Sequence, residues 1–177
     1  LPRYCFEGDN FSLWSYIDIH GNWTSPWIRS TAGLTDVAHK NGVTVGTLMS
    51  IPFGNSVYLT SWRSDVYSRV LFRLTQKSGD KFVYAEPLVR MMKYYGINGI
   101  GFNSEFRTSS SVMTQLSEFF VACHKEAEKL NWKFEVHWYD GTSDDGQIHF
   151  DGGLGYHNQK IFGDKDNIAT DMLFANY

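Results

Sequence analysis

Residues 95–106 read YGINGIGFNSEF, and the interpretation of the whole sequence starts from this stretch. An apolar run with helical spacing ends at Gly96, and a pattern with a period of two residues begins at Ile97. This change of period predicts a helix that ends at a glycine and a strand over residues 97–106.

The two faces of the predicted strand differ in chemistry, because alternate residues of a strand share a face. One face carries two glycines, an amide and a carboxylate: Gly99, Gly101, Asn103 and Glu105. The opposite face carries Ile100, Phe102, Ser104 and Phe106. Glycine weakens a strand and offers nothing to pack, so the first face is interpreted as keeping space open below Asn103 and Glu105. The alternative is an edge strand with a solvated face. It is disfavoured because Ile100, Phe102 and Phe106 are expected to be buried on the opposite face.

The composition is that of an ordinary globular protein. The chain has 177 residues, 42% of them hydrophobic, with a net charge of -3, and this length can bury a substantial core. No basic cluster indicates a nucleic-acid partner, and no apolar run is long enough to predict a membrane span. Aromatic residues make up 16%, and exposed aromatic rings are typical of sugar-binding clefts.

The sequence predicts neither a disulfide framework nor a metal or cofactor site. Cys5 and Cys123 are the two cysteines, and Cys123 lies on the apolar stripe of a predicted helix, which favours a buried free thiol. The histidine and aspartate spacings match no zinc or calcium pattern. The compartment stays open, with a secreted or cell-surface bacterial location favoured over a cytosolic one.

Strands and helices alternate along the predicted chain. Strands are expected at residues 13–19, 43–49, 97–106, 134–139 and 172–177. Helices are expected at residues 30–40 and 65–74, from Pro87 to Tyr95, and from a cap at Ser110 or Ser111 to Leu130. This alternation is typical of a parallel sheet covered by helices.

The loops favour a (β/α)8 TIM barrel within that class, because the long polar loops at residues 51–55 and 140–166 follow strands, where a barrel builds its active site. A doubly wound open sheet is the second choice, weakened by the absence of a Gly-rich phosphate loop. The sequence predicts about five strands, fewer than the eight of a complete barrel, and a barrel typically has about 250 residues. Residues 1–177 are therefore interpreted as a partial catalytic barrel domain, about strands two to six, truncated at both ends, with the remainder in another chain or missing.

Several motifs together carry a family resemblance. The segment NSE at residues 103–105, after YYGING at 94–99, resembles the catalytic Asn-x-Glu strand of glycoside hydrolase family 85, the endo-β-N-acetylglucosaminidases. Further similar segments follow in the family's order: YIDI at 16–19, AHKNGVTVGT at 38–47, HWYD at 137–140 and FANY at 174–177. The resemblance covers nearly the whole chain. Ser104, Phe106 and the loop at 51–54 depart from the family's pattern.

The chemistry at the strand end can be argued from the residues alone. Glycoside hydrolysis normally uses two carboxylates, but the acetamide of a 2-acetamido sugar can itself act as the nucleophile. Glu105 then serves as the acid/base, Asn103 orients the acetamide N–H, and the Tyr139 hydroxyl reaches the acetamide oxygen. The resemblance implies the same three roles.

Other residues are candidates for sugar contacts. The predicted substrate-binding set comprises Trp23, Trp138, Asn176, Asp140 and Phe102, with Trp27 and Trp62 as further possible platforms. Trp138 alternates away from Tyr139 along its strand, so core packing competes with sugar binding there.

The predicted function is cleavage of the GlcNAc-β1,4-GlcNAc core of N-glycans, with an N-glycan or glycoprotein as the partner. A chitinase-type enzyme of family 18 is an alternative, but it would carry an aspartate where this sequence has Asn103. A glycan-binding barrel without turnover is the second alternative.

Overall fold

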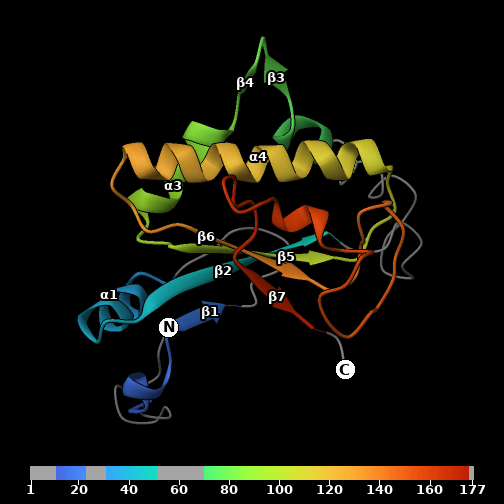
Figure 1. Ribbon diagram of the computed structural model, residues 1–177. Helices are drawn as coiled ribbons and strands as arrows, with labels where there is room; N and C mark the ends of the chain where they lie inside the picture. Colours follow the sequence, from blue (N-terminus) through green and yellow to red (C-terminus); the bar gives the residue numbers. More distant parts are fainter. Residues whose placement is uncertain (1–10, 23–30, 52–69, 176–177) are drawn as a thin grey trace, which may run out of the picture.

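A computed structural model describes residues 11–22, 31–51 and 70–175, which centre on one parallel sheet (Figure 1). Its order is β1-β2-β5-β6-β7, and all four neighbouring pairs are parallel. The strands are β1 (Ile19–Asn22), β2 (Thr44–Ile51), β5 (Gly99–Ser104), β6 (Glu135–Tyr139) and β7 (Met172–Phe174). Strand order follows chain order, whereas a doubly wound sheet reverses its order at a switch point.

The helices lie on one face of the sheet. Helices α3 (Ala85–Tyr94) and α4 (Ser110–Lys129) cover β5 and β6 (Figure 1), and the main core fills the space between these layers. Helix α1 (Ala32–Lys40) packs through Ala38 against Val45 of β2. Val45 shares its face with Met49, which belongs to the main core.

Helices on one face and a pocket on the other are the arrangement of a (β/α)8 barrel segment. The predicted fold class is confirmed, with strands in the predicted order. Residues 70–74 are also helical, and the short strands β3 (Lys77–Ser78) and β4 (Lys81–Phe82) form a hairpin beside α4 (Figure 1). No helix among the described residues has both the length and the apolar character needed to cross a membrane.

The predicted junction between helix and strand is present at Gly96. Its backbone has φ +70°, the left-handed conformation that favours glycine at the end of a helix. A Cβ there would also lie 2.7 Å from Thr35 Cγ2. The residue thus ends α3 and allows the chain to pass close to α1.

Helix α4 forms as its apolar stripe predicts. The predicted members of the stripe that are buried include Met113, Leu116, Phe119, Phe120, Cys123 and Ala127. Cys123 is free and buried, and burial raises the pKa of its thiol. The capping residue is Ser109, whose Oγ accepts a hydrogen bond from Val112 N at 3.4 Å, so the predicted cap lay one or two residues too late.

The first predicted strand is wrong in position. Residues Trp14–Tyr16 form the 3-10 helix η1, and β1 begins only at Ile19, which pairs with Thr44. Within the turn, Tyr16 N donates to Leu13 O at 3.0 Å. Trp14 and Ile17 still pack on the cluster around Ala38, so the apolar residues reach the core from a turn and not from a strand.

Candidate active site

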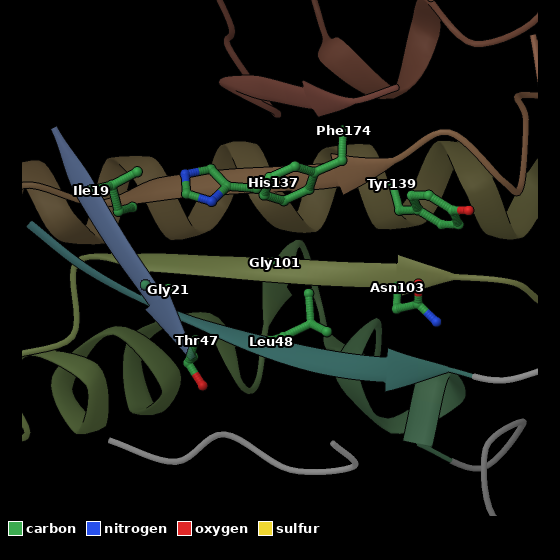
Figure 2. Close-up of a pocket in the computed structure, with 10 residues that line it drawn as sticks. Ile19, Gly21, Thr47, Leu48, Gly101, Asn103, His137, Tyr139 and Phe174 are labelled. Atoms are coloured by element: carbon green, nitrogen blue, oxygen red, sulfur yellow. The ribbon is translucent and has the colours of Figure 1, made fainter. Parts of the chain in front are cut away.

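The proposed catalytic residues meet where β5 and β6 end. Asn103 lies near the end of β5, Glu105 directly follows that strand, and Tyr139 is the last residue of β6. Figure 2 shows Asn103 and Tyr139 at the same end of the pocket. Neighbouring parallel strands bring their carboxyl ends to one edge of the sheet. Asn103 and Tyr139, although far apart in sequence, therefore become neighbours.

Asn103 and Glu105 form a direct pair. Asn103 Nδ2 donates a hydrogen bond to Glu105 Oε2 at 3.0 Å. Glu105 N also donates to Asn103 O at 3.1 Å, so the chain turns tightly and returns the carboxylate to the amide. Asn103 is 7% exposed, whereas Glu105 is half-buried. The predicted proximity of these two side chains is confirmed.

Tyr139 is electrostatically linked to this pair. Burial raises the pKa of the Tyr139 phenol, and the negative charges of Glu105 and Asp140 raise it further. The phenol therefore stays protonated at neutral pH and can donate a hydrogen bond.

A pocket of about 440 Å³ opens on the face of the sheet opposite the helices. Its lining comprises Ile19, Gly21, Gly46, Thr47, Leu48, Gly101, Asn103, His137, Tyr139 and Phe174 (Figure 2). His137 shares the face of Tyr139 and has a polar partner, since its Nε2 lies 3.3 Å from Glu135 Oε2.

The glycines of β5 make room for neighbouring side chains. A Cβ on Gly101 would lie 2.9 Å from Leu48 Cδ1, and a Cβ on Gly99 would lie 2.9 Å from His137 Cε1. These contacts are closer than carbon atoms tolerate. The space predicted on this face is thus partly used by Leu48 and His137, which form the floor beneath Asn103.

Two hydroxyl residues that the sequence interpretation missed connect the two strand ends. Ser104 Oγ donates to Tyr139 O at 2.7 Å. Thr142 Oγ1 lies 2.9 Å from Ser104 O and 2.7 Å from Phe106 O, and it accepts a hydrogen bond from Phe106 N at 3.1 Å. A sequence signal was present at Gly141, because a glycine just beyond the end of a strand can mark a close backbone approach.

Phe102 and Trp138 are not sugar platforms, contrary to prediction. Both side chains are 0% exposed, and their ring centroids lie 6.0 Å apart within the core beneath α4. A ring without exposed surface cannot stack on a sugar. Successive side chains of β6 point to opposite faces of the sheet, so Trp138 points to the helices and Tyr139 points to the pocket.

The prediction that Asp140 binds substrate is also wrong. It is 1% exposed, and its oxygens accept hydrogen bonds from Gly152 N at 2.6 Å and Asn158 Nδ2 at 3.1 Å. The carboxylate therefore organises the following loop and does not face a ligand. Trp23 and Asn176, like Trp27 and Trp62, lie outside the described residues.

The loop at residues 140–166 contributes exposed rings beside Tyr139. Phe150 is 45% exposed, and its ring centroid lies 6.2 Å from that of Tyr139. His149 and His157 stack at 4.9 Å. No group of three or more potential metal-ligating side chains gathers in the part of the chain that the structure describes.

Comparison with known proteins adds a family match. The model of glycosyl hydrolase family 85 matches residues 5–177. Among solved structures, the Spr0440 glycoside hydrolase domain, Endo-D, from Streptococcus pneumoniae R6 is similar, with a TM-score of 0.79 and 24% identity over 94% of this chain and 25% of that chain. This chain thus spans a quarter of the length of that one, and the likeness shows a shared fold. No curated protein matches the sequence.

Proposed function

Because this chain belongs to glycosyl hydrolase family 85, we propose that its site cleaves the GlcNAc-β1,4-GlcNAc core of N-glycans, as an endo-β-N-acetylglucosaminidase. The observation that carries the proposal is the Asn103–Glu105 pair, hydrogen-bonded at 3.0 Å at the carboxyl end of a barrel strand. An amide beside one carboxylate is the arrangement that a 2-acetamido sugar requires when its own acetamide is the nucleophile.

The shortage of carboxylates supports substrate assistance. Of the two carboxylates whose charges act on Tyr139, Glu105 and Asp140, Asp140 uses its oxygens within its own loop. A double displacement through an enzyme nucleophile would need a second carboxylate about 5 to 5.5 Å from the first. The site therefore favours the acetamide oxygen as the attacking group.

The proposed reaction proceeds in two steps. First, the acetamide oxygen bonds to the anomeric carbon while the glycosidic C–O bond breaks, and Glu105 gives its proton to the leaving oxygen. This step forms a bound oxazoline. In the second step, water attacks the anomeric carbon, Glu105 takes a proton from that water, and the acetamide is restored with net retention of configuration.

Asn103 and Tyr139 serve the acetamide in this scheme. The Asn103 side-chain oxygen accepts a hydrogen bond from the acetamide N–H as it gains positive charge, and its Nδ2 remains available to Glu105. The protonated Tyr139 hydroxyl donates to the acetamide oxygen. Trp23 and Asn176 remain proposed sugar contacts, and Phe150 is an exposed ring beside Tyr139 that can flank a sugar.

The test uses the full-length protein and a labelled N-glycopeptide. The expected product is a peptide that retains one GlcNAc, identified by its mass. Glu105→Gln is expected to lose hydrolysis while keeping glycan binding, because the isosteric amide cannot cycle a proton. Activity within about tenfold of wild type in that variant would remove Glu105 from the acid/base role. Binding without any cleavage by wild type would instead support a glycan-binding barrel.

A further inference from the structure

Glu105 lies just beyond the part of the sheet that holds β5 in place. The pairing of β5 with β2 ends at Ser104, and the pairing with β6 ends at Phe102. Among the described residues, no strand pairs with residues 105 and 106. A proton donor nevertheless has to be held within a fraction of an ångström of its productive position.

Thr142 supplies the missing restraint. Its backbone N donates to Ser104 O at 2.7 Å. Its hydroxyl accepts from Phe106 N at 3.1 Å and donates its single proton to either Phe106 O at 2.7 Å or Ser104 O at 2.9 Å. All of these partners are backbone groups of the two residues that flank Glu105.

We propose that Thr142 is a positioning residue that fixes the Glu105 backbone against the end of β6 and so aims the carboxylate at the substrate. It touches neither the substrate nor Glu105's carboxylate. The inference about turnover rests on the proposed glycosidase function, whereas the inference about where Glu105 lies does not.

Thr142 is itself held from two sides. Trp138 Nε1 donates to Thr142 O at 3.1 Å, and Trp138 is fully buried in the core. Gly141 lets the loop approach β5 closely, because a Cβ on Gly141 would collide with Ser104 O. A rigid indole on one side and a glycine contact on the other leave Thr142 little freedom. The same strand end thus presents Tyr139 to the pocket and braces Glu105.

Thr142→Val tests the proposal, because valine keeps the shape and removes the hydroxyl. Thr170→Val is the matched control: Thr170 is also buried, and its hydroxyl donates to Ile161 O at 2.9 Å in the same loop region, away from β5. Thr170→Val loses one donated hydrogen bond, whereas Thr142→Val loses one donated and one accepted hydrogen bond, so Thr142→Val is expected to lose more thermal stability. Thr142→Ser keeps the hydroxyl and is the conservative rescue.

In kinetic assays of the full-length protein on the N-glycopeptide, Thr142→Val should lower kcat by about ten- to a hundredfold with little change in KM. Thr142→Ser should recover to within about threefold of wild type, and Thr170→Val should keep its kcat. Equal kcat for the two valine variants would overturn the proposal. If Thr142→Val does not fold, Thr142→Ala is measured in its place against the same control.

Crystal structures of the variants provide a readout that does not depend on activity. With Thr142→Val, the Asn103 Nδ2–Glu105 Oε2 contact of 3.0 Å is expected to be lost or to lengthen, and with Thr170→Val it should be unchanged. A Glu105 carboxylate that stays in place without the Thr142 hydroxyl would overturn the proposal even if wild type proved inactive. Failure of wild type to cleave the glycopeptide would count against the glycosidase function alone.

Discussion

Asn103 and Glu105 pair a neutral amide with a carboxyl group, with Asn103 Nδ2 3.0 Å from Glu105 Oε2. An aspartate at position 103 would place a second negative charge there, and one of two such carboxyls would then keep its proton at higher pH. The Asn103 amide places no second negative charge at that position.

Asn103→Ala separates formation of the oxazoline from its later use. The variant loses the group proposed to hold the acetamide against the anomeric carbon, so the activation free energy for hydrolysis of the natural glycan should rise by about 3 kcal/mol, as for the loss of one preorganised donor. A ready-made sugar oxazoline bypasses that step, and Glu105 can still deprotonate an acceptor hydroxyl. The variant should therefore join donor to acceptor, as measured by mass spectrometry.

Two results would contradict the role of Asn103. One is an Asn103→Ala variant that is equally inactive with the oxazoline donor. The other is a sugar found covalently attached to a carboxylate of the protein, which would indicate an enzyme nucleophile.

Tyr139 should titrate above its ordinary pKa of about 10, because burial and the charges of Glu105 and Asp140 raise that pKa. The folded protein then holds this proton more tightly than the unfolded chain does. The stability from Tyr139 is fully present below about pH 10 and is lost as the pH rises through the folded-state pKa. Glu105→Gln removes one charge, so the Tyr139 pKa should fall but stay above the ordinary value.

The measurement is the tyrosinate absorbance during a pH titration, taken as a difference from Tyr139→Phe because the chain has ten tyrosines. Thermal unfolding over the same pH range checks the sign of the stability change. A Tyr139 that titrates at or below its ordinary pKa would contradict the assigned environment.

At the scale of elements, the periodicity of the sequence correctly predicted which side chains share a face of a strand or a helix. The face of β5 with Asn103, the stripe of α4 and the glycine end of α3 at Gly96 could all be inferred, because each follows from backbone geometry and local pattern. The position of the first strand could not be inferred. The apolar residues around Trp14 suit a strand or a turn equally, and pairing with β2 decides between them.

Contacts between side chains of different elements could not be predicted from the sequence either. Aromatic content alone did not distinguish Trp138, which fills the core, from Phe150, which is exposed. Thr142 carries no local signal for its role, since its hydroxyl partners, Ser104 and Phe106, lie 38 and 36 residues away in sequence, at and just beyond the end of β5. The departures from the family pattern at Ser104 and Phe106 concern residues whose backbones Thr142 holds.

Gly141→Ala tests how closely the loop after β6 must approach β5. An added Cβ would collide with the backbone oxygen of Ser104, which cannot move aside as a flexible side chain can. We expect a loss of about 1 to 3 kcal/mol in the free energy of unfolding, together with lower activity. Gly153→Ala is the control in the same loop, because nothing lies within 4 Å of its Cβ. Equal stability of the two variants, measured by denaturant unfolding, would contradict the close contact.

At the scale of the whole molecule, the described sheet has β1 and β7 as its outer strands, and its pocket face is covered by none of the described helices (Figure 1). Unpaired outer strands invite association with other chains. Residues 1–177 expressed alone are therefore expected to aggregate or to behave as a molten globule. Calorimetry and size-exclusion chromatography provide the measurement, and a sharp cooperative melt of a monomer would contradict the expectation.

The alternation of β6, with Trp138 toward the helices and Tyr139 toward the pocket, has an evolutionary consequence. A substitution at Trp138 changes the packing of the core, whereas a substitution at Tyr139 changes the lining of the pocket. Substitutions around Phe150 and the rest of the loop can therefore accumulate while the interior is left alone. Under the proposed function, the glycans that descendants of this chain accept can therefore change faster than the barrel that presents the site.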